Sequence, residues 1–114
     1  MSKQSRPIFS IAIAAIGAIT EYSFVTPARS QAGAGVNTLG VARFAANNGD
    51  TVTVDVMGTA IVQTGGAITD GGLVETDASG RAIAHNTGIV VGRLIPGQSS
   101  TGAGQWVEVL LMPN

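Results

Sequence analysis

The residues that could take part in catalysis are few and scattered along this chain. Its 114 residues include one histidine, seven aspartates and glutamates, and no cysteine. His85 is followed by Asn86-Thr87-Gly88, which predicts a loop, and no nucleophile elbow is present. We therefore interpret His85 as a solvated or hydrogen-bonded loop histidine. A hydrolase site assembled with His85 across an oligomer interface remains open as an alternative.

Motifs for metals and cofactors are equally sparse. Asp70 and Asp77 lie in glycine-containing turns on either side of Leu73–Thr76, but the alternating oxygen ligands and closing glutamate of a calcium loop are missing. We expect each aspartate to support its own turn. The stretch Gly102-Ala103-Gly104 lacks the Lys-Ser/Thr ending of a phosphate-binding loop. The sequence therefore predicts no catalytic residues, no metal site and no cofactor.

Composition and charge narrow the possible partners and the fold class. Six Lys or Arg residues face seven Asp or Glu residues, a net charge of −1. No basic cluster is present, so nucleic acid is not an expected partner. Only 11% of the residues are charged, 16 are glycine, and Ala, Val and Ile dominate the apolar fraction. Such a chain favours strands and turns within a single domain.

The region after Gly40 has the punctuation of an all-β domain, with short apolar runs between turn residues. The clearest strand is Thr51–Val56, which places Val52, Val54 and Val56 on one face. Asn47-Asn48-Gly49-Asp50 predicts a hairpin turn before it, and Gly58 predicts a bulge or bend. The further expected strands are Ala60–Val62, Leu73–Thr76, Arg81–Ile83, Ile89–Val91 and Trp106–Leu111.

The N-terminal region has a different character. Large and small apolar residues alternate within Phe9–Ala14, which favours an extended segment, and residues 26–38 resemble a linker in composition. We therefore expect an extended N-terminal arm and linker over residues 1–35 and a β-rich domain over residues 36–114. No charge interrupts the arm between Arg6 and Glu21, and its large apolar residues are Ile8, Phe9, Ile11, Ile13, Ile16 and Ile19.

The same region also supports a second interpretation. Lys3 and Arg6, the apolar stretch Ile8–Ile19 and the small residues within Ala28–Ala32 could form a signal peptide over residues 1–32. The chain would then be a secreted or periplasmic β-domain with an adhesive or carbohydrate-binding role. A membrane span is not expected, because the stretch falls short of the roughly 20 apolar residues that a spanning helix needs.

The order of motifs after Gly40 resembles a known protein family. The series begins with Gly49-Asp50 and the valine strand and continues with Gly58-Thr59-Ala60-Ile61-Val62 and Gly71-Gly72-Leu73-Val74. It ends with Asp77–Ala82, Val90–Leu94 and Val107–Leu111. This series is similar to the small head-decoration, or capsid cement, proteins of tailed double-stranded DNA bacteriophages. The resemblance covers roughly residues 36–112. Order and spacing carry it, since each motif alone is short.

The resemblance implies a fold, a location and a function. The fold would be all-β: a bent β-ribbon or incomplete small barrel of the β-clip kind, here with an extended N-terminal arm. The protein would be a homotrimer, assembled in the host cytoplasm and seated on the outer surface of the virion capsid. It would bind the major capsid protein and stabilise contacts between capsomers, with no enzymatic activity and no nucleic-acid or membrane partner.

Candidate interface residues come from the arm and from two positions in the β-rich region. A folded part of about 76 residues is marginal alone, so self-association is expected. An apolar arm can add to a neighbouring sheet edge through its backbone. Arg93 carries a guanidinium suited to interfacial carboxylates, and Trp106 is the single tryptophan. The expected interface therefore comprises Ile8, Phe9, Ile11, Ile13, Ile16, Ile19, Arg93 and Trp106.

Overall fold

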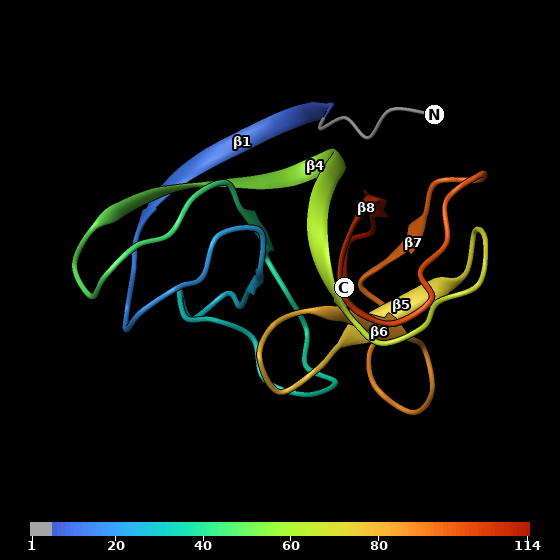
Figure 1. The fold of residues 1–114 in the computed structure, drawn as a ribbon. Coiled ribbons are helices and arrows are strands. Elements are labelled where there is room, and N and C mark those ends of the chain that lie inside the picture. Colours follow the sequence, from blue (N-terminus) through green and yellow to red (C-terminus); the bar gives the residue numbers. More distant parts are fainter. Residues whose placement is uncertain (1–5) are drawn as a thin grey trace.

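A single long, bent strand organises the computed structural model, which describes residues 6–114. Strand β4 (Thr51–Gly65) runs through both parts of the molecule (Figure 1). It bends at Gly58, whose φ of +93° is unfavourable for residues with a side chain. A Cβ atom at Gly58 would also lie 2.5 Å from the carbonyl oxygen of Arg6. The bend predicted at this glycine is therefore confirmed.

The first half of β4 belongs to an N-terminal sheet. It pairs antiparallel with β1 (Pro7–Ala14) on one side and with β3 (Gly40–Ala42) on the other, and β2 (Phe24–Val25) pairs with β3. The valine face is confirmed, because Val52 and Val54 are fully buried and Thr51 is exposed. Asp55 on the opposite face is also buried, and there its carboxylate accepts hydrogen bonds from Arg43 and Ser10.

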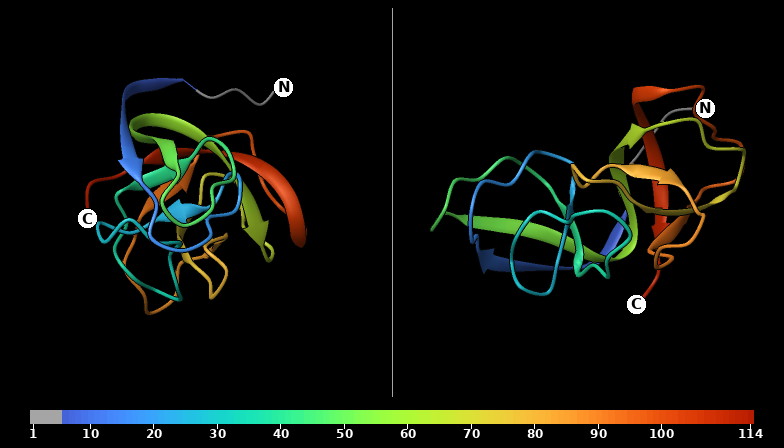
Figure 2. Two further views of the ribbon diagram at one scale, coloured as in Figure 1. Left: turned by 90° about the vertical axis from the view of Figure 1, so that its left-hand side faces the viewer. Right: turned by 90° about the horizontal axis from the view of Figure 1, so that it is seen from below.

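The second half of β4 closes a small barrel. The strand order is β4-β6-β5-β7-β8, and β8 pairs with β4 again, so the ring is closed rather than incomplete. The other members are β5 (Leu73–Thr76), β6 (Ala82–Ala84), β7 (Gly92–Leu94) and β8 (Ala103–Leu111). Figure 2 shows the barrel beside the N-terminal sheet. The fold is all-β, and within residues 6–114 no helix could span a membrane.

One expected strand is displaced along the chain. Ile89–Val91 was expected as a doubly buried strand, but β7 begins at Gly92, and Ile89 is exposed. The amide of Ile89 donates to Gly35 O, outside the barrel ladder, and the register with β5 begins only at Gly92. A Cβ atom at Gly92 would lie 2.6 Å from Leu110 O. The strand prediction was therefore wrong by a few residues, because the backbone of Ile89 is bound to Gly35 and only Val91 of the predicted run is buried.

The N-terminal segment packs more closely than an arm and linker would. Its residues 7–14 are extended, but Phe24 and Ala32 lie in the barrel core, and Ala15, Ile19 and Val25 lie in the core beneath the N-terminal sheet. The segment from Thr26 to Ser30 forms a hydrogen-bonded turn rather than a free linker. The folded body thus begins well before Val36. Residues 1–5 lie outside the described part of the chain.

Candidate docking surface

A row of paired residues crosses the outside of the barrel. Arg6 and Thr59 exchange both backbone hydrogen bonds, Thr59 pairs with Leu110, Leu110 with Arg93, and Arg93 with Leu73. Directly paired residues place their side chains on the same side of a sheet. In β8 the flanking Val109 is fully buried inside the barrel, whereas Leu110 is exposed. The row therefore faces outward.

Two further pairs extend this outward side along β4 and β8. Gln63 pairs with Trp106, and Ile61 pairs with Glu108. Trp106 is 41% exposed, and Leu110 and Leu73 are exposed to a similar degree, at 40% and 36%. These residues form one continuous surface, which we call the outer barrel face and define by its apolar and cationic members: Ile61, Leu73, Arg93, Trp106 and Leu110.

Arg93 is the cation of the outer barrel face, set between Leu73 and Leu110 in the row. Its Nε donates to the carbonyl oxygen of Gly71 at 3.1 Å, which orients the side chain at the surface. A guanidinium has five N–H donors, so this bond leaves others for a partner. Apolar side chains on both sides of a cation suit a partner surface that carries a carboxylate.

A second apolar cluster lies at the bend. The register of β1 and β4 shifts between Pro7 and Phe9, so that Ile8 is an extra residue opposite Met57. A bulge of this kind turns two consecutive side chains toward the same side. Ile8, Phe9 and Met57 are 79%, 54% and 50% exposed. We call these three residues the bend patch; it adjoins the outer barrel face through the pair of Arg6 and Thr59.

Glu75 and His85 together hold a loop in place. Glu75 is buried, and its Oε1 accepts the amides of Asn86 and Gly88 at 2.6 and 3.0 Å. The hydrogen bond from Asn86 is the largest cause of the lowered pKa of Glu75; the bond from Gly88 and the imidazole of His85 add to it, while burial opposes them. His85 Nδ1 lies 3.3 Å from the same oxygen. His85 thus closes a loop, as expected.

Asp70 and Asp77 were each expected to support their own turn, and only Asp77 does so. Asp77 accepts the amides of Ser79 and Arg81 and pairs with the guanidinium of Arg81. Asp70 instead accepts the amide of Gly97, so it fastens a neighbouring loop rather than its own turn. In the described part of the chain, no cluster of three or more His, Cys, Asp or Glu residues is placed to hold a metal ion.

Comparison with known families identifies the kind of protein. The sequence matches the family described as phage cement protein over residues 3–111. The chain belongs to this family. Its fold is similar to that of the head fiber gp8.5 N base in bacteriophage phi29, with a TM-score of 0.73, 18% identity, and coverage of 91% of this chain and 93% of that chain. A search of the curated proteins finds no significant match.

Membership gives the protein a place and a role: it is a capsid decoration protein located on the virion capsid. In this cement protein the predicted interface residues separate into groups. Ile8 and Phe9 lie in the bend patch, and Arg93 and Trp106 lie on the outer barrel face. Ile16 is exposed near the end of β1, outside both groups.

The remaining arm isoleucines of the cement protein face its own core. Ile19 is only 2% exposed, and Ile11 and Ile13 pack against the buried residues of the N-terminal sheet. Sequence reasoning missed Met57, Ile61, Leu73 and Leu110 as surface residues. For Leu110 a signal existed, because the alternation in Trp106–Leu111 places Val107 and Val109 on one side and Trp106 and Leu110 on the other.

Proposed function

We propose that this cement protein binds the major capsid protein through the outer barrel face and the adjoining bend patch. The observation that carries the proposal is the continuous set of exposed apolar side chains around Arg93, outside a barrel whose interior is already filled by its own residues. Single exposed apolar residues are ordinary, but a contiguous patch marks an interaction site. Trp106 and Arg93 belong to the residue types that dominate such interfaces.

The proposed role is mechanical. A subunit seated between capsomers adds buried contact area where the shell would otherwise open, and repetition over the shell makes modest contacts sufficient. We propose that no catalysis is involved: the single histidine is paired with Glu75 in a loop, and the carboxylate of Glu75 is held by backbone amides. Nucleic acid and membranes are not proposed as partners.

Self-association into a homotrimer is part of the proposal. Among the described strands, β1 pairs only with β4, so its other edge is available for a neighbouring chain. An exposed edge strand can add to a second sheet through backbone hydrogen bonds. Ala12 and Ala14 on this strand are exposed and small, which permits close approach of another backbone.

The alternative of a secreted β-domain requires residues 1–32 to be removed. In the folded protein, however, Phe24 and Ala32 fill the barrel core, and β1 covers one edge of β4. We propose that these residues are retained in the assembled virion. Intact mass measurement of the protein from purified virions tests this, and a mass lacking about 30 N-terminal residues would contradict it.

The docking proposal is tested by co-sedimentation of purified variants with undecorated shells. Leu110→Asp and Arg93→Glu place negative charge on the outer barrel face, and we expect each to reduce the bound copies per shell at least tenfold. Thr51→Asp is the matched control, because Thr51 is exposed on the N-terminal sheet. Melting temperatures of all variants show whether the fold is kept. Unchanged occupancy for folded Leu110→Asp and Arg93→Glu would refute docking through this face.

A further inference from the structure

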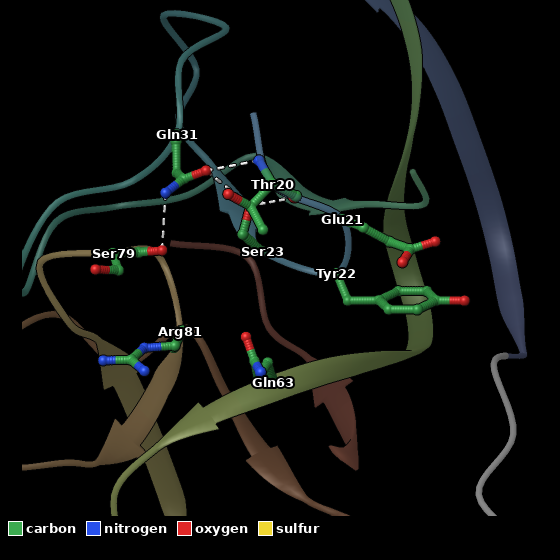
Figure 3. A pocket seen from close by; sticks show the side chains of 8 residues that line it. All are labelled: Thr20, Glu21, Tyr22, Ser23, Gln31, Gln63, Ser79 and Arg81. Atoms are coloured by element: carbon green, nitrogen blue, oxygen red, sulfur yellow. Dashed lines mark hydrogen bonds between the residues drawn. The ribbon is translucent and has the colours of Figure 1, made fainter. Parts of the chain in front are cut away.

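A pocket of about 310 Å³ lies where the N-terminal part meets the barrel. One wall comes from the segment that contains Thr20, Tyr22 and Gln31, and the other from Gln63, Ser79 and Arg81 of the barrel (Figure 3). The volume is at the lower end of the range of small-ligand sites, about 300–1,000 Å³. His85, Asp70 and Asp77 do not line the pocket, whereas Ser79 and Arg81, which flank the Asp77 turn, do.

One amide side chain bridges two walls of the pocket. Gln31 Oε1 accepts the backbone amide of Thr20 at 2.7 Å, and the Ser23 hydroxyl, which donates to Thr20 O at 2.7 Å, lies 3.4 Å from the same oxygen. Its Nε2 donates to the carbonyl oxygen of Ser79 at 2.9 Å, across the pocket (Figure 3). The two walls are therefore tied together by the protein itself. A preformed pocket binds a ligand at a lower cost in conformational entropy.

An aromatic pair borders the pocket. Tyr22 has a φ of +59°, a region that non-glycine residues rarely occupy. Its backbone is fixed there, because its amide donates to Ala42 O and its carbonyl accepts from the amide of Gln63. The ring packs edge-on against Trp106, with centroids 5.3 Å apart. Trp106 remains 41% exposed, so the pair presents aromatic surface beside the polar pocket.

We propose that this pocket binds a neutral saccharide. A sugar ring combines an apolar C–H face, which suits the ring of Tyr22, with hydroxyl groups that suit amide and hydroxyl side chains such as those of Gln63 and Ser79. The lining does not favour a strongly charged ligand, since Glu21 and Arg81 contribute one charge of each sign and Arg81 already pairs with Asp77. The pocket adjoins the outer barrel face, because Tyr22 contacts Trp106 and Gln63 pairs with Trp106.

The test is an amide-resolved NMR titration of the full-length protein. The probes are maltotriose and N,N′-diacetylchitobiose, with inorganic phosphate as the charged comparison. We expect a neutral sugar to shift the amides of residues 20–23, 31, 63 and 79–81 and the indole N–H of Trp106. Tyr22→Asn removes the ring while tolerating the positive φ, and we expect roughly tenfold weaker binding. Gln63→Ala removes one lining amide without altering the Gln31 bridge and should also weaken binding.

A control variant outside the pocket shows whether any loss of sugar binding is specific to the pocket. Phe44→Ala removes an exposed aromatic ring outside the pocket and should leave binding unchanged. The amide spectrum of each variant reports whether the fold is kept, and Gln63→Ala carries the test if Tyr22→Asn unfolds. The proposal would be overturned if neither sugar shifts these amide signals at concentrations close to the solubility limit of the sugar. Stronger shifts with phosphate, or sugar shifts confined to other residues, would overturn it as well.

Discussion

Replacing Val54 by aspartate tests the packing of the longest strand. Val54 is fully buried, and its direct partners are Ile11 on β1 and Ala42 on β3. Losing a buried valine costs about 1.5–3 kcal/mol, and burying an unpaired carboxylate adds several kcal/mol. The free energy of unfolding of a domain of this size is roughly 6–17 kcal/mol. We therefore expect Val54→Asp to remove a large part of the stability or to prevent folding.

The neighbouring position supplies the comparison. Thr53 is half-buried on the opposite side of β4, beside Ala12 and near Arg43, whose amide donates to Thr53 O. A carboxylate there stays partly hydrated, although Asp55 lies on the same side of the strand, so Thr53→Asp should cost much less than Val54→Asp, about 1 kcal/mol. For a domain of this size, each kcal/mol shifts the melting temperature by about 4 °C or somewhat more. Thermal unfolding followed by circular dichroism measures the difference.

If Val54→Asp does not fold, Val54→Ala gives a measurable value. It removes two methyl groups from a filled site, and we expect a loss of about 1–3 kcal/mol in urea unfolding, whereas Thr53→Ala should lose about 0.5 kcal/mol or less. Equal midpoints for the two alanine variants would refute the assigned register of β4. They would also refute the account in which β1 and β3 cover the same face.

The remaining predictions concern the Glu75 loop and β1. The pKa of Glu75 is lower in the folded chain than in the unfolded chain, so its ionised carboxylate stabilises the fold above the unfolded pKa. This stabilisation is lost as the pH falls through the pKa of the folded chain, and Glu75→Gln should flatten the acid side of a plot of unfolding free energy against pH. Gly88→Ala should cost about 1–3 kcal/mol in urea unfolding, because the added Cβ would lie 2.6 Å from Gly35 Cα, whereas Gly33→Ala meets open space and should cost little. Deleting residues 2–20 should lower the melting temperature as well as shell binding, since Ala15 and Ile19 are core residues; an unchanged melting temperature would contradict this.

Local sequence patterns predicted those parts of the fold that local physics determines. The alternation of Val52 and Val54, the bend at Gly58 and the turn at Asp77 depend on neighbouring residues, and each is found where expected. The packing of Phe24 and Ala32 into the barrel depends on contacts with distant residues, which a single sequence does not encode in any local period. The composition of residues 26–38 suggested a linker because turns and linkers use the same residue types.

For the candidate docking surface, too, sequence predicts only the residues that are distinctive by type. Trp106 is the single tryptophan and Arg93 a cation, so both could be predicted as interface residues from sequence alone. Their neighbours Leu73 and Ile61 become part of one surface only through the strand register, which brings β5, β7, β8 and β4 side by side. The isoleucines of the arm were predicted to be interface residues because they are apolar, but Ile11 and Ile13 pack against the core of their own chain.

The bend of β4 gives the two proposed contact sites a fixed relation. The bend patch and the outer barrel face lie on opposite sides of Gly58 along one hydrogen-bonded strand, paired to β1 before the bend and to β8 after it. A rigid angle between two contact sites lets one subunit engage two capsid subunits at a defined orientation, so that the second contact forms without further loss of rotational freedom. Gly58→Ala should therefore weaken shell binding more than a substitution that removes a comparable contact area from either patch. The added Cβ is strained at a φ of +93° and meets the Arg6 carbonyl, so it disturbs the bend itself. Co-sedimentation measures the effect, and unchanged binding by a folded Gly58→Ala protein would show that docking does not depend on the bend.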